Sequence, residues 1–532
     1  MRSSTTGLAL AAIALASCGR SGPASLAALP EGTPVVLVSI DTLRSDHLPA
    51  YGYEGVATPA IDRFRDDSLL FERVYAAAPT TLPSHASILT GLVPPRHGVR
   101  DNLGYRLAPE TNTLTAALRR RNYATGGFIS AFVLRDATGL DAGFERYDDD
   151  IELVSRLQLG ELQRPGGATL AAALDWLDGI NEADEAGATD AGSEAGGRPF
   201  FLFLHLYEPH SPYDPPEPFA SRYDSAYDGE VAAADAVVGD LLTALEERGL
   251  YDPALIVLLS DHGEGLGDHG ESEHGILLYR EALQVPLLVK LPAGHDAGDS
   301  AKAATAAPAG LVDVTPTVLA LLGIEPEGEL DGRALLTPSG ASPGASAGAP
   351  PDGSGEWERA LYAESFYPRL HFGWSDLASI IAGRHHLIHG PEPELYDLVD
   401  DPGETRNLLG ERRRDFARLR KTLESYDRSL APPAAADEET RRKLHRTIDF
   451  VRTEIDALRF NTAIARLIEL NNHLTKEGRT PREVAEPLVL MLSPFAPHVG
   501  EELWRRLDHD GTITYEDFPV ADPALLEEDT IE

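Results

Sequence analysis

A hydroxyl-rich segment could carry the chemistry of this chain. Thr80 and Thr81 stand before Pro83, a short apolar run follows, and Gly91 comes after it. This order predicts a helix that starts near Thr81 and ends at Gly91. A helix N-terminus presents unpaired N–H groups and the positive end of the helix dipole, both of which favour anions. A threonine there could act on an anionic group, or it could simply cap the helix.

Three apolar runs are each followed at once by polar side chains. The runs are residues 34–40, 200–206 and 255–259, and the polar clusters are residues 41–46, 207–213 and 260–265. Continuous apolar runs predict strands buried on both faces, as in a parallel sheet covered by helices. Helical patterns at residues 170–177 and 231–248 complete an α/β fold. Because sites in such sheets form outside the carboxyl ends of the strands, we expect the three clusters to converge.

Residues 81–91 read Thr-x-Pro-Ser-His-x-x-x-Leu-Thr-Gly, which resembles the nucleophile segment of the sulfatases, a branch of the alkaline phosphatase superfamily. Sulfatases carry a Cys or Ser at the position of Thr81, which is oxidised to formylglycine, and an Arg at the position of His85. A threonine cannot become formylglycine, whereas the phosphodiesterases of the superfamily use a threonine nucleophile. The resemblance therefore implies a hydrolase of sulfuric or phosphoric esters and leaves the transferred group open.

The resemblance covers most of the chain, residues 33–430. It implies a catalytic domain over residues 33–335, with a mostly parallel sheet covered by helices. A smaller C-terminal α+β subdomain with a short antiparallel sheet is implied over residues 356–430. Runs of small and acidic residues predict inserted loops at residues 185–197 and 338–355. With 532 residues the chain is too long for one ordinary core, so several domains are expected.

The resemblance also implies a metal site. Asp41, Asp261 and His262 stand at the positions of metal ligands, with the Thr81 oxygen as a fourth ligand. Sulfatases usually carry a second acidic residue directly after the position of Asp41, where this chain has Thr42. Two carboxylates, an imidazole and an alkoxide suit Zn²⁺ or Mn²⁺ as well as Ca²⁺. We therefore expect one divalent ion and leave its identity open.

Four further residues are candidates for catalysis. Asn102 would stabilise charge on the non-bridging oxygens of the ester. His210 and His274 would protonate the leaving alkoxide or orient the ester, although either could be an exposed loop histidine. His85 would be an electrostatic partner of the ester.

An ester formed on the threonine oxygen cannot be released by elimination, so water must attack it in line. This route favours phosphoric esters and diesters of a small molecule or a glycan. A metal-binding surface protein without catalytic activity is the alternative of a different class.

The first 18 residues have the layout of a secretion signal. Arg2 precedes an apolar run from Leu8 to Ala16, which is too short to span a bilayer. The following Leu-Ala-Ser-Cys, ending at Cys18, resembles the bacterial lipobox and implies acylation of that thiol. We expect an exported protein anchored to a bacterial membrane by lipid, although an ordinary apolar segment with a chance cysteine would read the same way. Cys18 is the only cysteine, so no intramolecular disulfide can form.

The last hundred residues have a different character, after a linker at residues 431–439. Leu444, Ile448, Val451, Ile455 and Leu458 are spaced by four and three, which predicts an amphipathic helix. Residues 480–483 read as a capping box that opens a second helix, which a proline at position 487 should kink or restart.

Residues 440–532 resemble the anticodon-binding helical domain of leucyl-tRNA synthetases. The resemblance rests on residues 458–463, 494–498 and 502–504. A net charge of −39 argues against non-specific binding of nucleic acid, and an exported protein would meet no tRNA. We therefore expect no tRNA partner. Three interpretations remain: a gene fusion or assembly artefact, an inert helical appendage, or a tRNA-binding module in a protein that stays inside the cell.

Overall fold

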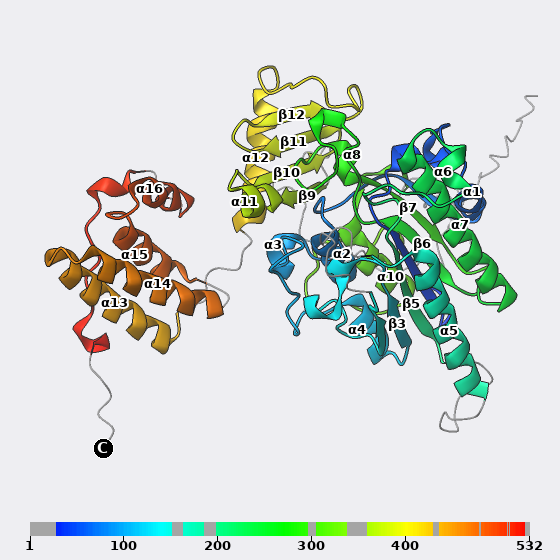
Figure 1. Ribbon diagram of the computed structural model, residues 1–532, viewed down its shortest axis with the longest axis horizontal. Helices are drawn as coiled ribbons and strands as arrows, with labels where there is room; N and C mark the ends of the chain where they lie inside the picture. The colour runs from blue at the N-terminus through cyan, green and yellow to red at the C-terminus, as the bar shows by residue number, and fades with distance from the viewer. Residues whose placement is uncertain are drawn as a thin grey trace, which may run out of the picture. The chain divides into compact units, whose positions relative to one another are not determined.

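The computed structural model describes residues 28–151, 163–185, 198–295, 305–337, 359–428, 436–477, 480–507, 509 and 511–526. The predicted signal segment with Cys18 lies outside the described residues. So do residues 186–197, 338–355 and 431–435 of the predicted loops and linker. The chain forms two compact units, residues 1–426 (unit 1) and residues 427–532 (unit 2), both drawn in Figure 1.

Unit 1 is built on an eight-stranded sheet with the order β4-β3-β5-β1-β6-β7-β2-β8. The strands are β1 (Val35–Ile40), β2 (Leu69–Tyr75), β3 (Ala124–Phe128), β4 (Arg146–Asp148), β5 (Phe200–Leu206), β6 (Leu255–Ser260), β7 (Gln284–Lys290) and β8 (Ala309–Gly310). Strands β4, β3, β5, β1 and β6 run parallel to one another, and β7 runs antiparallel to β6. The predicted, mostly parallel sheet is confirmed.

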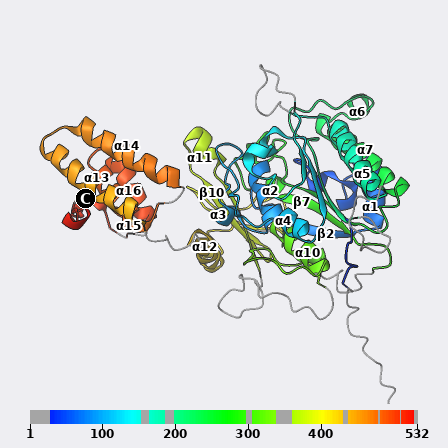
Figure 2. The ribbon, with the colours of Figure 1, turned by 90° about the horizontal axis from the view of Figure 1, so that it is seen from below.

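The three central strands are buried along their whole length, which explains their continuous apolar sequences. Helices cover both faces of the sheet (Figure 2). One face packs against α2 (Thr81–Thr90), α4 (Leu114–Arg120) and α10 (Val314–Leu321), and the other against α1 (Pro59–Asp66), α5 (Gly166–Glu185) and α7 (Ala226–Glu247). Shorter helices are α3 (Pro94–His97), α6 (Phe219–Arg222) and α8 (Arg280–Leu283).

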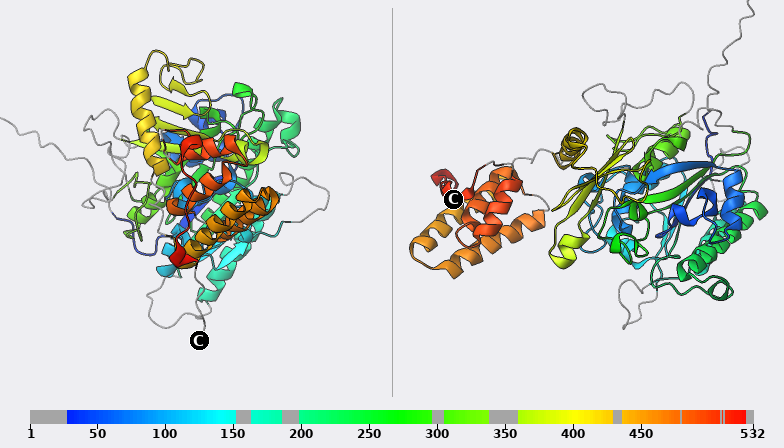
Figure 3. Two further views of the ribbon diagram at one scale, coloured as in Figure 1. Left: turned by 90° about the vertical axis from the view of Figure 1, so that its left-hand side faces the viewer. Right: turned by 90° about the horizontal axis from the view of Figure 1, so that it is seen from above.

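A second, four-stranded antiparallel sheet follows in the chain. Its order is β12-β11-β10-β9, with β9 (Ala360–Ser365), β10 (Leu377–Ala382), β11 (His385–His389) and β12 (Glu394–Asp397). Helix α11 (Tyr367–Phe372) follows β9, and α12 (Arg413–Arg428) lies beside the sheet (Figure 3). Leu419 and Leu423 of α12 are buried in the same apolar cluster as residues of the sheet. Strand β9 joins this sheet to the main one, because Glu364 donates its backbone N–H to the carbonyl of Ala77.

Unit 2 is all-helical, as predicted. It contains α13 (Glu438–Asp456), α14 (Phe460–Glu477), α15 (Arg482–Leu492) and α16 (Pro497–Arg506). Leu444, Ile448 and Val451 of α13 are buried in its core, which confirms most of the predicted apolar face. Leu458 is the exception: it follows the end of α13, adopts φ 57° and is 75% exposed.

Two further expectations for unit 2 were wrong. Asp437 is the N-cap of α13 and accepts the N–H of Thr440, so the end of the predicted linker belongs to a helix. No capping box forms, because Pro481 occupies the N-cap of α15 and the Glu483 carboxylate accepts the N–H of Ala436 instead. Helix α15 continues through Pro487, so it is not restarted there, and its apolar face is buried on both sides of the proline.

Among the described residues, no helix combines the length and the apolar character needed to cross a membrane.

Candidate active site

The N-terminus of α2 lies at the carboxyl ends of β1 and β6. Asp41 directly follows β1, and Asp261 and His262 directly follow β6. Because β1 and β6 are parallel neighbours that pair Ile40 with Ser260, the two aspartates emerge at the same edge of the sheet. The ligand atoms of Asp41, Asp261 and His262 all lie within 4.8 Å of one another. The Thr81 Oγ1 atom lies 3.3 Å from His262 Nε2, so the structure brings together all four predicted metal ligands.

The unpaired atoms of this cluster fit a divalent cation. His262 donates its Nδ1–H to the carbonyl of Gly263, which leaves the Nε2 lone pair free. This Nε2 lies 3.6 Å from Asp41 Oδ1 and 3.5 Å from Asp261 Oδ2. Both Asp41 oxygens and Asp261 Oδ2 are buried without a hydrogen bond among the described residues. Two ligands at about 2.1 Å from one ion lie about 3.4 Å apart at a tetrahedral angle, so the donor set is spaced as ligands would be.

Buried charge sets the electrostatics of the cluster. Burial, and then the nearby charge of Asp41, raises the pKa of Asp261. Two buried carboxylates at this separation repel each other, and a cation between them would remove the penalty. Burial lowers the pKa of His205, which lies beside them, to about 4, so that imidazole is neutral at pH 7.

The hydroxyl of Thr81 is not consumed by helix capping. Thr80 occupies the N-cap of α2, but its side chain makes no capping hydrogen bond. The carbonyl oxygen of the Asn102 side chain instead accepts the N–H of Leu82 at 2.8 Å. Asn102 therefore helps to fix the first turn of α2, and Thr81 remains the first helical residue, as the sequence predicted. At the other end, Gly91 takes φ 71° and ends the helix.

His85 lies one turn into α2 and is completely buried. Its Nδ1 lies 2.8 Å from the Thr81 carbonyl oxygen and its Nε2 lies 2.9 Å from Ser39 Oγ. Both nitrogens are thus engaged with protein atoms. Burial lowers the pKa of His85 to about 4, which leaves it neutral. In this arrangement His85 ties α2 to β1 and so positions Thr81.

His210 and His274 both belong to the cluster. The His274 ring centroid lies 4.5 Å from that of His262 and 4.9 Å from that of His210. Neither is an exposed loop histidine: the His274 side chain is 10% exposed, and His210 stacks on Tyr207 at 4.4 Å. Burial lowers the pKa of His210 to about 4.

Glu264 is a functional candidate to which the sequence assigned no role. Its carboxylate is buried and accepts a hydrogen bond from His274 Nδ1 at 3.1 Å. Burial alone would lower the pKa of His274, but the Glu264 charge and hydrogen bond outweigh it and raise that pKa to about 9. The cluster therefore contains one imidazolium, His274, beside neutral histidines. The available signal was the position of Glu264, three residues after Asp261 in the same polar cluster.

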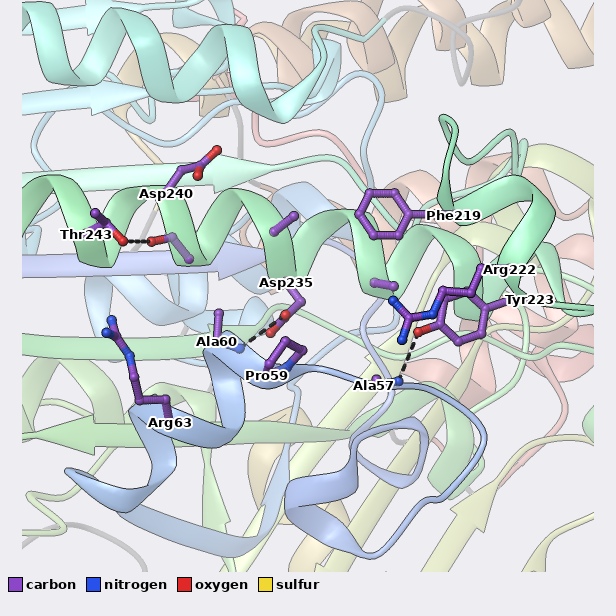
Figure 4. Close-up of a pocket in the computed structure, with 13 residues that line it drawn as sticks. Ala57, Pro59, Ala60, Arg63, Phe219, Arg222, Tyr223, Asp235, Asp240 and Thr243 are labelled. Carbon is purple, nitrogen blue, oxygen red and sulfur yellow. Dashed lines mark hydrogen bonds between the residues drawn. The ribbon is translucent and has the colours of Figure 1, made fainter.

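A separate pocket lies between α1, α6 and α7 (Figure 4). None of the candidate catalytic or metal-binding residues lines it. Its buried carboxylate, Asp235, accepts the N–H groups of Ala60 and Ile61 and so caps α1. The hydroxyl oxygen of Tyr223 accepts the N–H of Ala57. These contacts give Asp235 and Tyr223 a structural role.

Comparison with known proteins separates the two units. The family model described as Sulfatase matches residues 33–324, and the model described as the anticodon-binding domain of tRNA ligase matches residues 437–532. Both resemblances seen in the sequence are confirmed.

Solved structures resemble the first part of the chain. The structure of BT4656 with its substrate D-glucosamine-2-N,6-O-disulfate is 20% identical, with a TM-score of 0.58, and the match covers 75% of this chain and 98% of that one. The phosphonate monoester hydrolase of Agrobacterium radiobacter is 21% identical, with a TM-score of 0.56, over 76% of this chain and 98% of that one. At these identities the likeness concerns the fold.

Curated relatives match the last part. The leucine–tRNA ligase of Salinispora tropica is 57% identical over 130 residues, which are 24% of this chain and 14% of that protein. The Streptomyces coelicolor enzyme is 48% identical over 139 residues, 25% of this chain and 14% of that protein. The chain thus spans about a seventh of the length of these relatives.

Proposed function

The chain belongs to the sulfatase family, and we propose that it is a metal-dependent hydrolase of phosphoric esters or diesters with Thr81 as its nucleophile. The observation that carries the proposal is the contact of Thr81 Oγ1 with His262 Nε2 at 3.3 Å, beside the unpaired oxygens of Asp41 and Asp261. A hydroxyl held at a helix N-terminus among unpaired ligand atoms has the surroundings of an activated nucleophile.

Asp41, Asp261 and His262 would hold the cation. When bound, that ion would lower the pKa of the Thr81 hydroxyl and offset charge on the ester oxygens. Thr81 then attacks the phosphorus atom from the start of α2, where the helix dipole favours the anionic ester. Asn102, anchored through its carbonyl oxygen to the Leu82 N–H, keeps its amide N–H groups for a non-bridging oxygen.

His274 is the proposed acid for the leaving group. Glu264 holds its Nδ1–H, so the second proton of the imidazolium sits on Nε2. With its pKa raised to about 9, His274 carries that proton at neutral pH and gives it to the departing alkoxide. His210, whose pKa is lowered, remains a neutral partner that can orient the ester.

The threonine favours phosphorus over sulfur. After the first step the phosphate or sulfate ester on Thr81 has no neighbouring hydroxyl for elimination, so water must displace the threonine oxygen in line. Among the fold neighbours, one has a sulfated glucosamine as its substrate and another is a phosphonate monoester hydrolase. These neighbours support an ester substrate, and the nucleophile supports the phosphoric class.

Two further proposals concern the ends of the chain. We propose that residues 1–18 direct export and that Cys18 is lipidated, which would anchor the protein to the cell envelope; metabolic labelling with palmitate should label wild type and not Cys18→Ser. We also propose that unit 2 binds no tRNA here, because an exported and strongly acidic protein would not meet it.

The decisive experiment is a panel of Zn²⁺, Mn²⁺ and Ca²⁺ against aryl phosphate, phosphodiester and aryl sulfate substrates. The expected result is metal-dependent turnover that is fastest on a phosphoric ester. Sulfate as the best substrate would refute the phosphoric class. Metal binding without turnover of any ester would favour the alternative, a non-catalytic metal-binding surface protein.

A further inference from the structure

His205 is the buried polar group near the site that the mechanism leaves unexplained. It lies in β5, in which all the remaining residues are Phe or Leu, and its side chain is completely buried. Neither ring nitrogen has a hydrogen-bond partner among the described residues. Nearly all buried polar groups in proteins are hydrogen-bonded, so this imidazole indicates a partner that the described part of the chain does not supply.

The strand register places His205 beside the aspartates. His205 of β5 and Leu259 of β6 both pair with Ser39 of β1. Side chains two residues apart along a strand point to the same face, so Asp41 and Asp261 emerge on the face that carries His205. His205 Nε2 consequently lies 3.5 Å from Asp41 Oδ2. Donor atoms of His205 and Asp261 also lie within 4.8 Å of each other.

The separation of 3.5 Å is that of two ligands rather than of a hydrogen bond. Hydrogen bonds from N–H to oxygen span roughly 2.7–3.2 Å. The Nε2 atom of His262 shows the same spacing to the carboxylates, 3.5 Å to Asp261 and 3.6 Å to Asp41. Two atoms bound to one ion at about 2.1 Å are about 3.4 Å apart at a tetrahedral angle. His205 therefore faces Asp41, and His262 faces both aspartates, at ligand spacing.

The second imidazole near Asp261, that of His85, is not available as a metal ligand. His85 also has a nitrogen within 4.8 Å of His205 and Asp261. Its two nitrogens, however, are already bonded to the Thr81 carbonyl and to Ser39 Oγ. Of the two histidines, only His205 has a ring nitrogen without a hydrogen-bond partner among the described residues.

We propose that His205 binds a divalent cation together with Asp41 and Asp261, and that this nitrogen donor makes the site selective for Zn²⁺ over Ca²⁺. Imidazole is a preferred ligand of zinc, whereas calcium takes oxygen ligands. The inference deepens the proposed function and rests on it for the cation, but its test measures metal binding and not turnover.

The test uses the full-length protein, freed of metal by chelation and titrated with Co²⁺, whose visible absorption reports its ligands. Zn²⁺ and Ca²⁺ then compete for the site, and bound metal is counted by elemental analysis. The variants are His205→Gln and His205→Leu. His97→Gln is the matched control, because His97 is also a buried histidine of unit 1 but is bonded to Ser87.

Both His205 variants should lose Co²⁺ and Zn²⁺ affinity by at least about 100-fold, the upper end of what an outer-shell partner is worth. Their Co²⁺ bands should change, their Ca²⁺ affinity should stay near that of wild type, and His97→Gln should match wild type throughout. Unchanged affinity and bands would overturn the inference. Weaker binding with unchanged bands would overturn it too, because His205 would then only position Asp41.

Wild-type protein provides a test if neither variant folds. In its Co²⁺ form, two exchangeable imidazole N–H protons with strongly shifted resonances are expected, from His205 and His262. One such proton would overturn the inference. Metal bound through His205 without hydrolysis of any ester would instead contradict the proposed function alone.

Discussion

The two buried aspartates of the candidate site in unit 1 and the buried Glu454 of unit 2 have opposite surroundings. In unit 1, Asp41 and Asp261 are completely buried, and three of their four oxygens lack a hydrogen bond among the described residues. In unit 2, the buried carboxylate of Glu454 accepts hydrogen bonds from two nitrogens of Arg459. Because an unpaired buried charge is costly, the cluster in unit 1 fits a cation, whereas Glu454 in unit 2 already has its counter-charge in Arg459.

The region most identical in sequence to known proteins is therefore not the region that contains the candidate site. The match that is 57% identical to a leucine–tRNA ligase covers 130 residues, more than unit 2 contains, whereas the solved structures that resemble the fold of unit 1 are about a fifth identical. Yet both groups of side chains found among the described residues that could hold a metal ion belong to unit 1. A strong match in sequence identified an ancestry, and the unpaired side chains identified a site.

The largest effect on activity is expected from removal of the nucleophile in unit 1. Thr81→Ala should reduce kcat by at least about 10³-fold, because the covalent route is lost. Steady-state kinetics on an aryl phosphate, with circular dichroism to show an unchanged fold, checks this. Thr80→Ala is the matched control, because that side chain makes no capping hydrogen bond and its loss should change kcat little. Full activity in Thr81→Ala would remove the assignment.

The next largest effect is expected from removal of the metal, to which only unit 1 should respond. Chelation should abolish hydrolysis and destabilise unit 1 alone. Re-addition of Zn²⁺ at 100 times its dissociation constant should raise the free energy of unfolding of unit 1 by about 2.7 kcal/mol. Calorimetry should show one transition that shifts with metal and one, from unit 2, that does not. Equal shifts of both transitions would contradict the location of the site in unit 1.

Loss of the proposed acid should affect poor leaving groups most. His274→Gln should lower kcat for an alkyl phosphate by about 10²-fold or more, and the loss should be much smaller for 4-nitrophenyl phosphate, which needs no protonation. Glu264→Gln should show the same pattern more weakly, because it acts through His274. Equal losses on both substrates would assign His274 to positioning.

Acid should weaken unit 1 through a histidine outside the site. Burial lowers the pKa of His97 to about 3, so the unfolded chain binds its proton more readily than the folded chain does. Stability from this group is therefore present above pH 6.5 and falls with pH down to about 3, by about 1.4 kcal/mol per pH unit. Denaturant unfolding should show a flatter dependence between pH 4 and 6.5 in His97→Gln. An unchanged slope would contradict this account.

The smallest effect on activity is expected from the core of unit 2. Ile448→Ala removes a buried side chain of α13 and should cost unit 2 about 2–5 kcal/mol. The kcat of the full-length protein at 25 °C should equal that of wild type. A parallel loss of turnover would show that unit 2 contributes to hydrolysis.

Much of unit 1 could be predicted from local sequence. The continuous apolar runs at β1, β5 and β6 matched their strands closely, since strands buried on both faces leave no room for alternation. Polar residues directly after those strands had to meet at one edge, because parallel strands share their carboxyl ends. This rule was sufficient to bring Asp41 together with Asp261 and His262, whereas only the family resemblance placed Thr81 with them.

Errors arose where a distant contact overrode a local signal. Glu483 bonds to Ala436, 47 positions away, instead of closing a capping box. Leu458 kept the spacing of the apolar face of α13, but the helix had already ended. Likewise, Glu264 stood in a quoted cluster, yet only the 3.1 Å contact with His274 gave it a role.

The sequence by itself determined the α/β class, the two-part organisation and the types of side chain at the strand ends, because each follows from periodicity and composition along the chain. Tertiary structure alone decided which buried groups are satisfied. His85 and His205 are both histidines within apolar surroundings, and nothing in their local sequences distinguishes them. Packing gives both nitrogens of His85 a protein partner, whereas those of His205 have none among the described residues and lie near carboxylate oxygens that also lack one, since hydrogen-bond partners depend on contacts between distant segments.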